Sequence, residues 1–179
     1  GSYNVVVTAT DAAGNSANAN DSGSLDSPMV VTVVGDSVAE GGSNTFSVNL
    51  THASTVATDV SFTLSSGSAT VGSDTGVVSV NTGSGYVTAT ADADGVYHVS
   101  VPANTTAFSV QVVTTDDLVY EGNETYTLTA SANSVSQSGT ATITDVADLP
   151  TIQSVTGNSI AEGGSNTFSV NLTHASTVA

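Results

Sequence analysis

The sequence contains no lysine and no arginine, and its 16 Asp and Glu residues give a formal net charge of −16. Binding to nucleic acid or to an anionic membrane surface depends on basic side chains, so neither partner is expected. For the same reason the sequence predicts that no salt bridge forms within the chain. Clustered carboxylates would repel one another unless a metal ion came between them.

Cysteine is also absent, which excludes a disulfide framework and thiolate chemistry. There is no run of 18 apolar residues and no signal peptide, as we expect for an internal segment of a longer protein. No glycine-rich phosphate loop occurs, and a Ser-His-Asp triad would have to be assembled from isolated turn residues. The sequence therefore predicts no enzyme.

The sequence does contain abundant β-branched and small residues, and its hydrophobic fraction of 39% favours a folded chain over a disordered one. Apolar residues alternate with Ser, Thr, Asn and Gln, and no stretch has helical periodicity. This pattern predicts an all-β protein, an antiparallel β-sandwich with one face of each sheet in the core. The residues predicted to point inward are Phe46, Val48, Leu50, Val60, Phe62, Leu64, Phe108, Val110, Val112, Tyr126, Leu128, Ala130, Ala141 and Ile143.

A less regular stretch, residues 67–102, contains a predicted hairpin with strands over 86–91 and 96–101. The turn between them holds Asp92 and Asp94 and ends on Gly95. These two acids are interpreted as an Asp-Gly turn, and the alternative is a pair of metal ligands.

An internal repeat sets the domain organisation. Residues 36–57 and 158–179 are identical at 20 of 22 positions, at an offset of 122 residues. Pro28 and Pro150 keep this offset, as do Asp26 and Asp148. We therefore expect a complete repeat over 28–149, the first strands of the next copy over 150–179, and a longer tandem array of which this chain is one window.

Residues 1–27 do not match the end of this repeat. Tyr3, Val5, Val7 and Ala9 alternate with other residues before a predicted turn at 11–15. The segment resembles the closing strands of bacterial immunoglobulin-like domains, so it is interpreted as the C-terminal strands of such a domain. The alternative is that Gly1 and Ser2 remain from cloning and precede an unrelated segment.

The densest group of acids is Asp116, Asp117, Glu121 and Glu124, which fall within nine residues between two strongly alternating stretches. Calcium takes six to eight oxygen ligands, and a loop at a strand end lets several oxygens converge. The absence of Cys and the scarcity of His disfavour softer metals. The alternative is that these acids keep the surface soluble and prevent strand edges from pairing.

Four segments together resemble the Calx-β domain, a calcium-binding β-sandwich: AEGG at 39–42, GSD at 72–74, DDLVYEGNET at 116–125 and GTATITD at 139–145. The resemblance implies that calcium binds between loops at one end of the sandwich. It implies the ligands Glu40, Asp74, Asp116, Asp117, the carbonyl of Val119, Glu121, Glu124 and Asp145.

Three more acids, Asp26, Asp36 and Asp148, are expected at domain junctions. There they are either ligands of a calcium ion that stiffens the linker or parts of a polar hinge. His52 and His174 occupy equivalent positions in a Thr-His-Ala-Ser loop and are interpreted as turn residues, and His98 is expected on the exposed face of a strand.

Near-identical acidic repeats after an immunoglobulin-like domain resemble the extender region of large bacterial RTX-type adhesins. This implies an extracellular, cell-surface protein that calcium stiffens, with a role in surface attachment and biofilm formation. Its partners would be neighbouring repeats, and host, surface or biofilm matrix ligands would be bound by other domains. One alternative is a recognition module for glycan, protein or ice, for which Tyr86 and Tyr97 are the main hint. Another is a subunit of an extracellular filament or surface layer.

Overall fold

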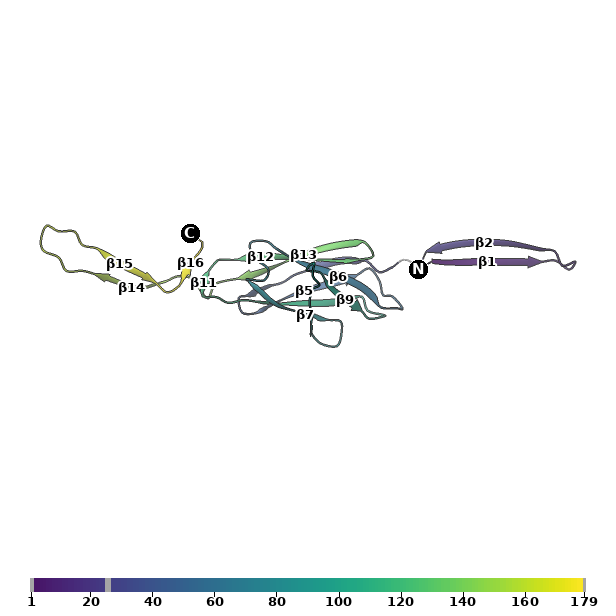
Figure 1. Ribbon diagram of the computed structural model, residues 1–179, viewed down its shortest axis with the longest axis horizontal. Coiled ribbons are helices and arrows are strands. Elements are labelled where there is room, and N and C mark those ends of the chain that lie inside the picture. The colour runs from purple at the N-terminus through teal and green to yellow at the C-terminus, as the bar shows by residue number, and fades with distance from the viewer. Residues whose placement is uncertain (1, 25–26, 179) are drawn as a thin grey trace.

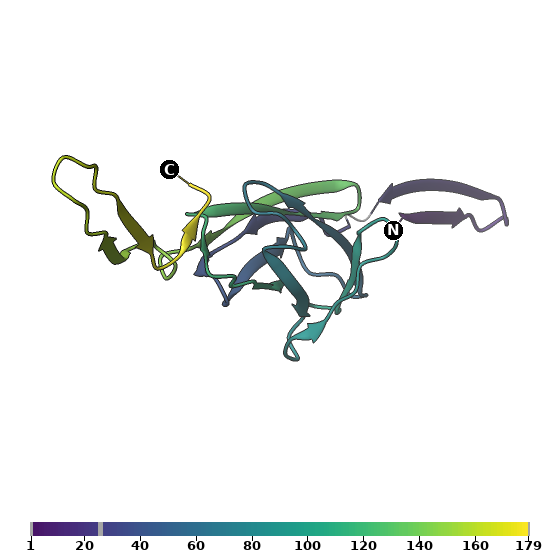
Figure 2. The ribbon, with the colours of Figure 1, turned by 60° about the vertical axis from the view of Figure 1, so that its left-hand side comes forward.

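The computed structural model describes residues 2–24 and 27–178, and every regular element in them is a β-strand (Figure 1). The all-β prediction is therefore confirmed. A hairpin, a central sandwich and a second hairpin follow one another along the long axis (Figures 1 and 2). Within the described part of the chain, no helix is long and apolar enough to cross a membrane.

Two five-stranded sheets form the sandwich. In spatial order the first consists of β3 (Val30–Val34), β5 (Ser43–Leu50), β10 (Ala107–Thr114), β7 (Thr75–Asn81) and β8 (Val87–Thr88). The second consists of β4 (Ser37–Ala39), β13 (Val135–Thr144), β12 (Glu124–Ala132), β6 (Thr58–Ser66) and β9 (Tyr97–Val101). All neighbours are antiparallel except β4 and β13. This is the immunoglobulin arrangement, with strands A, B, E and D in one sheet and C, F and G in the other.

The first two strands of the sandwich connect its two sheets, because β3 lies in the first sheet and β4 in the second. Close approach between β3 and β13 requires glycine at two positions. A Cβ atom on Gly139 would lie 2.5 Å from the carbonyl oxygen of Val33, and one on Gly35 would lie 2.5 Å from that of Thr140. The edges of the two sheets can therefore meet only where no side chain stands between them.

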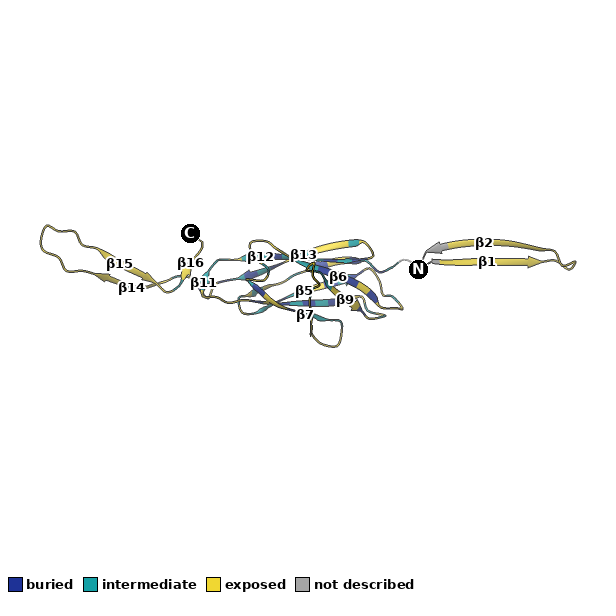
Figure 3. Ribbon diagram, viewed as in Figure 1, coloured by how far each residue is buried: buried dark blue, intermediate teal, exposed yellow. Residues whose placement is uncertain are grey.

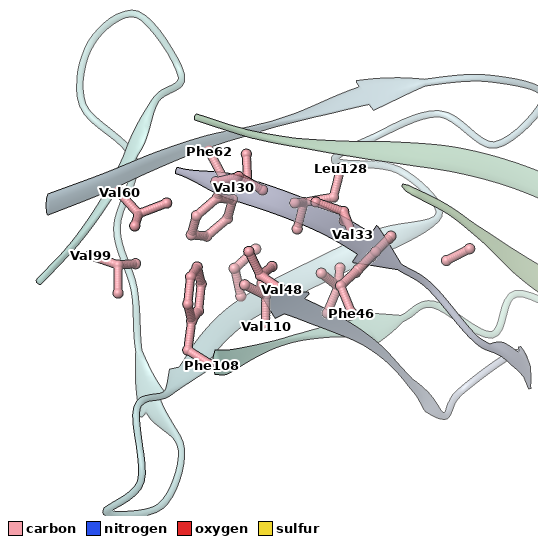
Figure 4. Close-up of a cluster of buried hydrophobic side chains, with 14 of the residues drawn as sticks. Val30, Val33, Phe46, Val48, Val60, Phe62, Val99, Phe108, Val110 and Leu128 are labelled. Atoms are coloured by element: carbon pink, nitrogen blue, oxygen red, sulfur yellow. The ribbon is translucent and has the colours of Figure 1, made fainter. Parts of the chain in front are cut away.

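The core lies between the sheets and includes the residues that the alternation predicts (Figure 4). All of them are buried except Leu64, which is half-buried and packs against the others. The rings of Phe46 and Tyr126 meet edge to face with centroids 5.6 Å apart. Burying a side chain of the size of Val, Leu or Phe contributes about 1.5–3 kcal/mol, so this cluster is the main source of stability.

The prediction that strands over 86–91 and 96–101 pair with each other is wrong. β8 pairs with β7 in the first sheet, and β9 pairs with β6 in the second, so the chain between them crosses the sandwich edge. The ring of Tyr97 stacks on Phe62 with centroids 4.8 Å apart, and Val99 and Val101 are buried. Core packing therefore draws β9 to the second sheet. The turn is present, because the N–H of Asp92 donates to the carbonyl of Val96 at 2.9 Å.

The N-terminal hairpin pairs β1 (Ser2–Thr10) with β2 (Ser16–Ser24) around the predicted turn. In that turn Asp11 Oδ1 accepts the N–H groups of Ala13 and Asn15, each at 2.9 Å. The apolar residues of β1 are exposed (Figure 3).

The C-terminal hairpin pairs β14 (Ile152–Gly157) with β15 (Phe168–Leu172). Val155 lies opposite Val170, and at the same offset of 122 residues Val33 lies opposite Val48. The sequence repeat is therefore also a repeat in strand register. Two short strands that lie far apart in the sequence, β11 (Val119–Tyr120) and β16 (Ala175–Ser176), pair with each other.

Candidate metal centre

The acidic residues converge because several strands begin or end at the same end of the sandwich. β10 runs antiparallel to β5 and β7, so its end lies beside their beginnings. β13 ends beside the start of β12 and beside the end of β4, with which it is parallel. The loops at these points, together with the first residue of β12, carry eight acids: Glu40, Asp74, Asp116, Asp117, Glu121, Glu124, Asp145 and Asp148.

Two groups of three carboxylates form within this cluster. In each group one oxygen atom of every member lies within 4.8 Å of the others. Glu40, Asp116 and Asp148 form the first group. Asp74, Glu121 and Glu124 form the second. Each group combines residues that lie far apart in the sequence, so the fold itself assembles them.

Asp117 and Asp145 connect the two groups electrostatically. Asp145 is only 2% exposed, and its Oδ2 accepts the N–H of Glu121 at 2.7 Å. After desolvation by burial, the charges of Asp117 and Asp145 are among the causes that raise the pKa of Glu40 in the first group and of Glu121 in the second. All eight carboxylates therefore form one cluster of like charge.

Burial and mutual repulsion raise the pKa of two members far above the ordinary value. Desolvation, followed by the charge of Asp145, raises the pKa of Glu40 from 4.5 to about 7. Desolvation, followed by the charge of Asp74, raises the pKa of Glu124 from 4.5 to about 7. At neutral pH these two side chains resist ionisation, because burial and the neighbouring carboxylates both disfavour their charged form.

Four buried carboxylate oxygens have no hydrogen-bond partner among the described residues: Glu40 Oε2, Glu124 Oε2, Asp145 Oδ1 and Asp148 Oδ2. Buried polar atoms are nearly always paired, and an unpaired buried charge is costly. A cation between these oxygens would satisfy them and remove the repulsion. The two groups offer only oxygen ligands, which suit hard cations such as calcium and magnesium.

The loop between β10 and β11 holds a strained conformation. Leu118 has a φ of 67°, in the left-handed region that a leucine rarely adopts. Asp117 Oδ1 accepts the N–H of Val119 at 2.9 Å, which stabilises this turn. Gly41, with a φ of 70°, adopts the left-handed conformation that glycine favours, and it lies beside Asp116. Such strain at a cluster of polar groups is typical of functional sites.

The structure brings together the seven acids that the sequence points to most strongly, and it adds Asp148, which is 4% exposed. Val119 lies beside them in β11, and its carbonyl as a ligand stays a prediction. The only sequence signal for Asp148 was its position one repeat after Asp26, which lies outside the described residues.

The other weaker candidates belong to neither group. Asp36 Oδ1 accepts Asn44 Nδ2 and the N–H of Thr45, each at 2.9 Å, so this carboxylate is bound within the sandwich. Asp92 Oδ1 accepts the N–H groups of Asp94 and Val96, which is the turn arrangement. Neither residue supplies a buried unpaired oxygen.

The prediction that no salt bridge forms overlooked histidine. His98 Nε2 lies 3.1 Å from Asp92 Oδ2, and His174 Nε2 lies 3.7 Å from Asp148 Oδ1, so each pair is an ion pair when the imidazole is protonated. His98 is exposed on β9, as expected. His174 is more than a turn residue, because it covers a member of the acidic cluster.

No protein-family model and no curated protein matches the chain. Among solved structures it is similar to the apo form of the Calx CBD1 domain, with 15% identity, 66% of this chain and 98% of that chain covered, and a TM-score of 0.45. It is also similar to CBD12 from CALX1.2, with 16% identity and a TM-score of 0.44, where the match covers 64% of this chain and 45% of that chain. A non-cellulosomal cohesin from Archaeoglobus fulgidus is similar at 13% identity and a TM-score of 0.40, covering 65% of this chain and 91% of that one. Because these TM-scores are below 0.5, the function is inferred from the acidic side chains.

Proposed function

We propose that this chain is part of a calcium-binding structural repeat array. One observation carries the proposal: four buried carboxylate oxygens, in a cluster of eight acids, have no partner in the described part of a chain without Lys or Arg. Glu40, Asp116 and Asp148 would hold one ion, and Asp74, Glu121 and Glu124 a second. Asp117 and Asp145 would support both.

The proposal includes the division of the chain. Residues 1–27 end an immunoglobulin-like domain, 28–149 form a complete repeat, and 150–179 begin the next copy. The shared register of the two copies supports this division. We place the array in the extender region of an RTX-type bacterial surface adhesin, outside the cell, where it holds a distal binding domain away from the surface during attachment and biofilm formation.

Calcium would act on the acidic end through charge. Bound calcium supplies positive charge between carboxylates that otherwise repel one another, and it orders the loops that carry them. Extracellular modules bind calcium with dissociation constants of about 10⁻⁴–10⁻³ M, so the sites would fill outside the cell and empty inside it. The array would then be stiff outside the cell and flexible inside it.

A recognition module is less well supported. Tyr97 packs against Phe62 in the core, so Tyr86, which is 43% exposed, has no aromatic neighbour in β9. A depression beside β6 and β9 is lined by Ser, Val, Ala, Asn, Asp59 and His98, without Phe, Tyr or Trp. Aromatic anchors are typical of recognition surfaces.

Thermal unfolding in calcium and in EDTA tests the proposal. If 1 mM calcium is about ten times the dissociation constant, two sites stabilise the fold by about 3 kcal/mol. That corresponds to an increase in Tm of about 6–12 °C for a chain of this size. The double variant Asp116→Asn/Asp117→Asn should lose most of this increase, and the matched control Asp92→Asn/Asp94→Asn should keep it. An equal Tm in calcium and EDTA would refute the proposal, and the same increase produced by sodium at equal ionic strength would show screening alone.

A further inference from the structure

We infer that each repeat covers the acidic end of the preceding repeat with its own Thr-His-Ala-Ser loop, so that two consecutive repeats together enclose the metal centre. The contact itself stands on the geometry below, and its coupling to calcium rests on the proposed function. The partner is a second copy of the same repeat in the same chain.

Strand pairing joins the two copies. The chain leaves the sandwich, forms the β14–β15 hairpin, and returns so that β16 lies beside β11 (Figures 1 and 2). The pairing is parallel, with Val119 opposite Ala175 and Tyr120 opposite Ser176. The N–H of Thr177 donates to the carbonyl of Tyr120 at 3.0 Å. This backbone ladder gives the junction a defined register.

Side chains extend the contact on both sides of the ladder. Val178 lies 3.9 Å from the place where Gly122 would carry a Cβ. His174 Nε2 lies 3.7 Å from Asp148 Oδ1, and Asp148 is 4% exposed. The loop of the second copy therefore helps to bury a carboxylate of the first metal group.

The same loop in the first copy shows what docking changes. Residues 51–57 form no strand, although the sequence is identical to 173–179. Val56 is 67% exposed, and its equivalent Val178 is 45% exposed. The strand conformation of β16 therefore depends on the partner β11.

A loop docked in this way can stay anchored in its own repeat. In the first copy the carbonyl of Ser54 accepts the N–H of Asn104 at 2.7 Å. Docking uses a different group, the N–H of Thr177, whose equivalent is Thr55. A complete repeat can therefore form both bonds at once. Residues 51–56 would contact the domain before the first repeat in the same manner.

Docking and metal binding should favour each other. β11 lies directly between Asp117 and Glu121, so pairing with β16 orders the segment that carries the ligands. By linkage, an ordered loop binds metal more tightly, and bound metal tightens the junction by the same factor.

The test uses the whole 179-residue chain, which has no native cysteine. Spin labels on Gln137→Cys in β13 and Ser169→Cys in β15 report the distance between the sandwich and the second copy. Thr177→Pro removes the N–H that donates to Tyr120, and Thr55→Pro makes the same change where no β11 faces the loop. Val178→Asp and Val56→Asp form a second matched pair, which places a charge at the contact without changing the backbone.

We expect a narrow distance distribution for the parent chain in calcium, a broad one for Thr177→Pro and Val178→Asp, and a narrow one for both first-copy controls. Calorimetry should show calcium affinity at least about tenfold weaker in the two second-copy variants. Unchanged distributions in both of these variants would overturn docking. If calcium bound to no variant, the proposed function would fail, and the distance distributions would still decide the docking contact.

Discussion

At the scale of single residues, Asp145 has opposite effects in the two states of the protein. Without metal its buried, unpaired oxygen and its charge beside Glu40 and Glu121 oppose folding. With metal the same charge attracts the ion. A carboxylate at a metal centre should lower the stability of the metal-free protein and raise the stability of the metal-bound protein. A carboxylate with a purely structural role should not have these opposite effects.

The variant Asp145→Asn should therefore change stability in opposite directions. In EDTA the free energy of unfolding should rise by about 1 kcal/mol, because a neutral amide can keep the bond to the Glu121 N–H without an unpaired charge. Calcium affinity should fall at least about tenfold, which is about 1.4 kcal/mol. Denaturant titrations in EDTA and in calcium measure both effects. Asp59→Asn, at an exposed position of β6, is the control, and a loss of stability in EDTA would contradict the account.

The pH dependence should reverse on metal binding. Because the pKa values of Glu40 and Glu124 are raised from 4.5 to about 7, the folded state holds these protons more tightly than the unfolded state does. The contribution of these two side chains to stability in EDTA is therefore fully present below about pH 4.5 and is lost as the pH rises through about 7. In calcium the carboxylates bind as anions, so stability should rise over the same range. Tm measured from pH 5 to 8 checks this, and Glu40→Gln/Glu124→Gln should flatten both curves.

At the scale of elements, the loop between β10 and β11 carries strain beside the ligands. A left-handed conformation costs an ordinary L-residue about 1–2 kcal/mol, whereas Asn adopts it readily. Leu118 is 65% exposed, so little packing is lost when it is replaced.

We therefore expect Leu118→Asn to raise the free energy of unfolding in EDTA by about 0.5–1 kcal/mol. Leu149→Asn, at an exposed position outside the left-handed region, should leave it unchanged. Urea denaturation measures both. Equal effects of the two variants would show that the conformation of Leu118 stores no strain.

The close approach of the sheet edges gives a second prediction for an element. Gly139→Ala would place a Cβ 2.5 Å from the carbonyl oxygen of Val33, so β3 and β13 would have to separate. We expect a loss of about 1–3 kcal/mol in the free energy of unfolding. Gly76→Ala meets ordinary contacts at 3.9 Å and should change it by less than about 0.5 kcal/mol. Denaturant unfolding of the two variants side by side decides the point.

The elements also show how far the sequence could predict this fold and site. Period-two alternation identifies the core strands because one face of each strand is buried, and the acids fall in loops that such a topology must bring together. The strand that pairs with β9 could not be predicted, because the stacking of Tyr97 on Phe62 determines it and these residues lie far apart in the sequence. Asp148 was given too little weight for a related reason: its neighbour His174 follows it by 26 positions and returns to it only after a hairpin.

At the scale of the whole molecule, the net charge of −16 means that the surrounding solution has to supply positive charge. Half of the 16 acids lie at one end of one sandwich, where β16 also docks. Apart from His174, which lies beside Asp148, positive charge must reach that end from the solvent, and the buried oxygens there favour a bound ion over a diffuse ionic atmosphere. On the proposed function, the acidic end of each repeat is both its metal centre and its junction with the next.

A crystal structure of the chain grown in millimolar calcium, with anomalous difference maps, tests this account most directly. We predict anomalous peaks between Glu40, Asp116 and Asp148 and between Asp74, Glu121 and Glu124, each with six to eight oxygen neighbours at about 2.3–2.6 Å. A map without peaks at this end of the sandwich, with the eight carboxylates contacting only water, would contradict it.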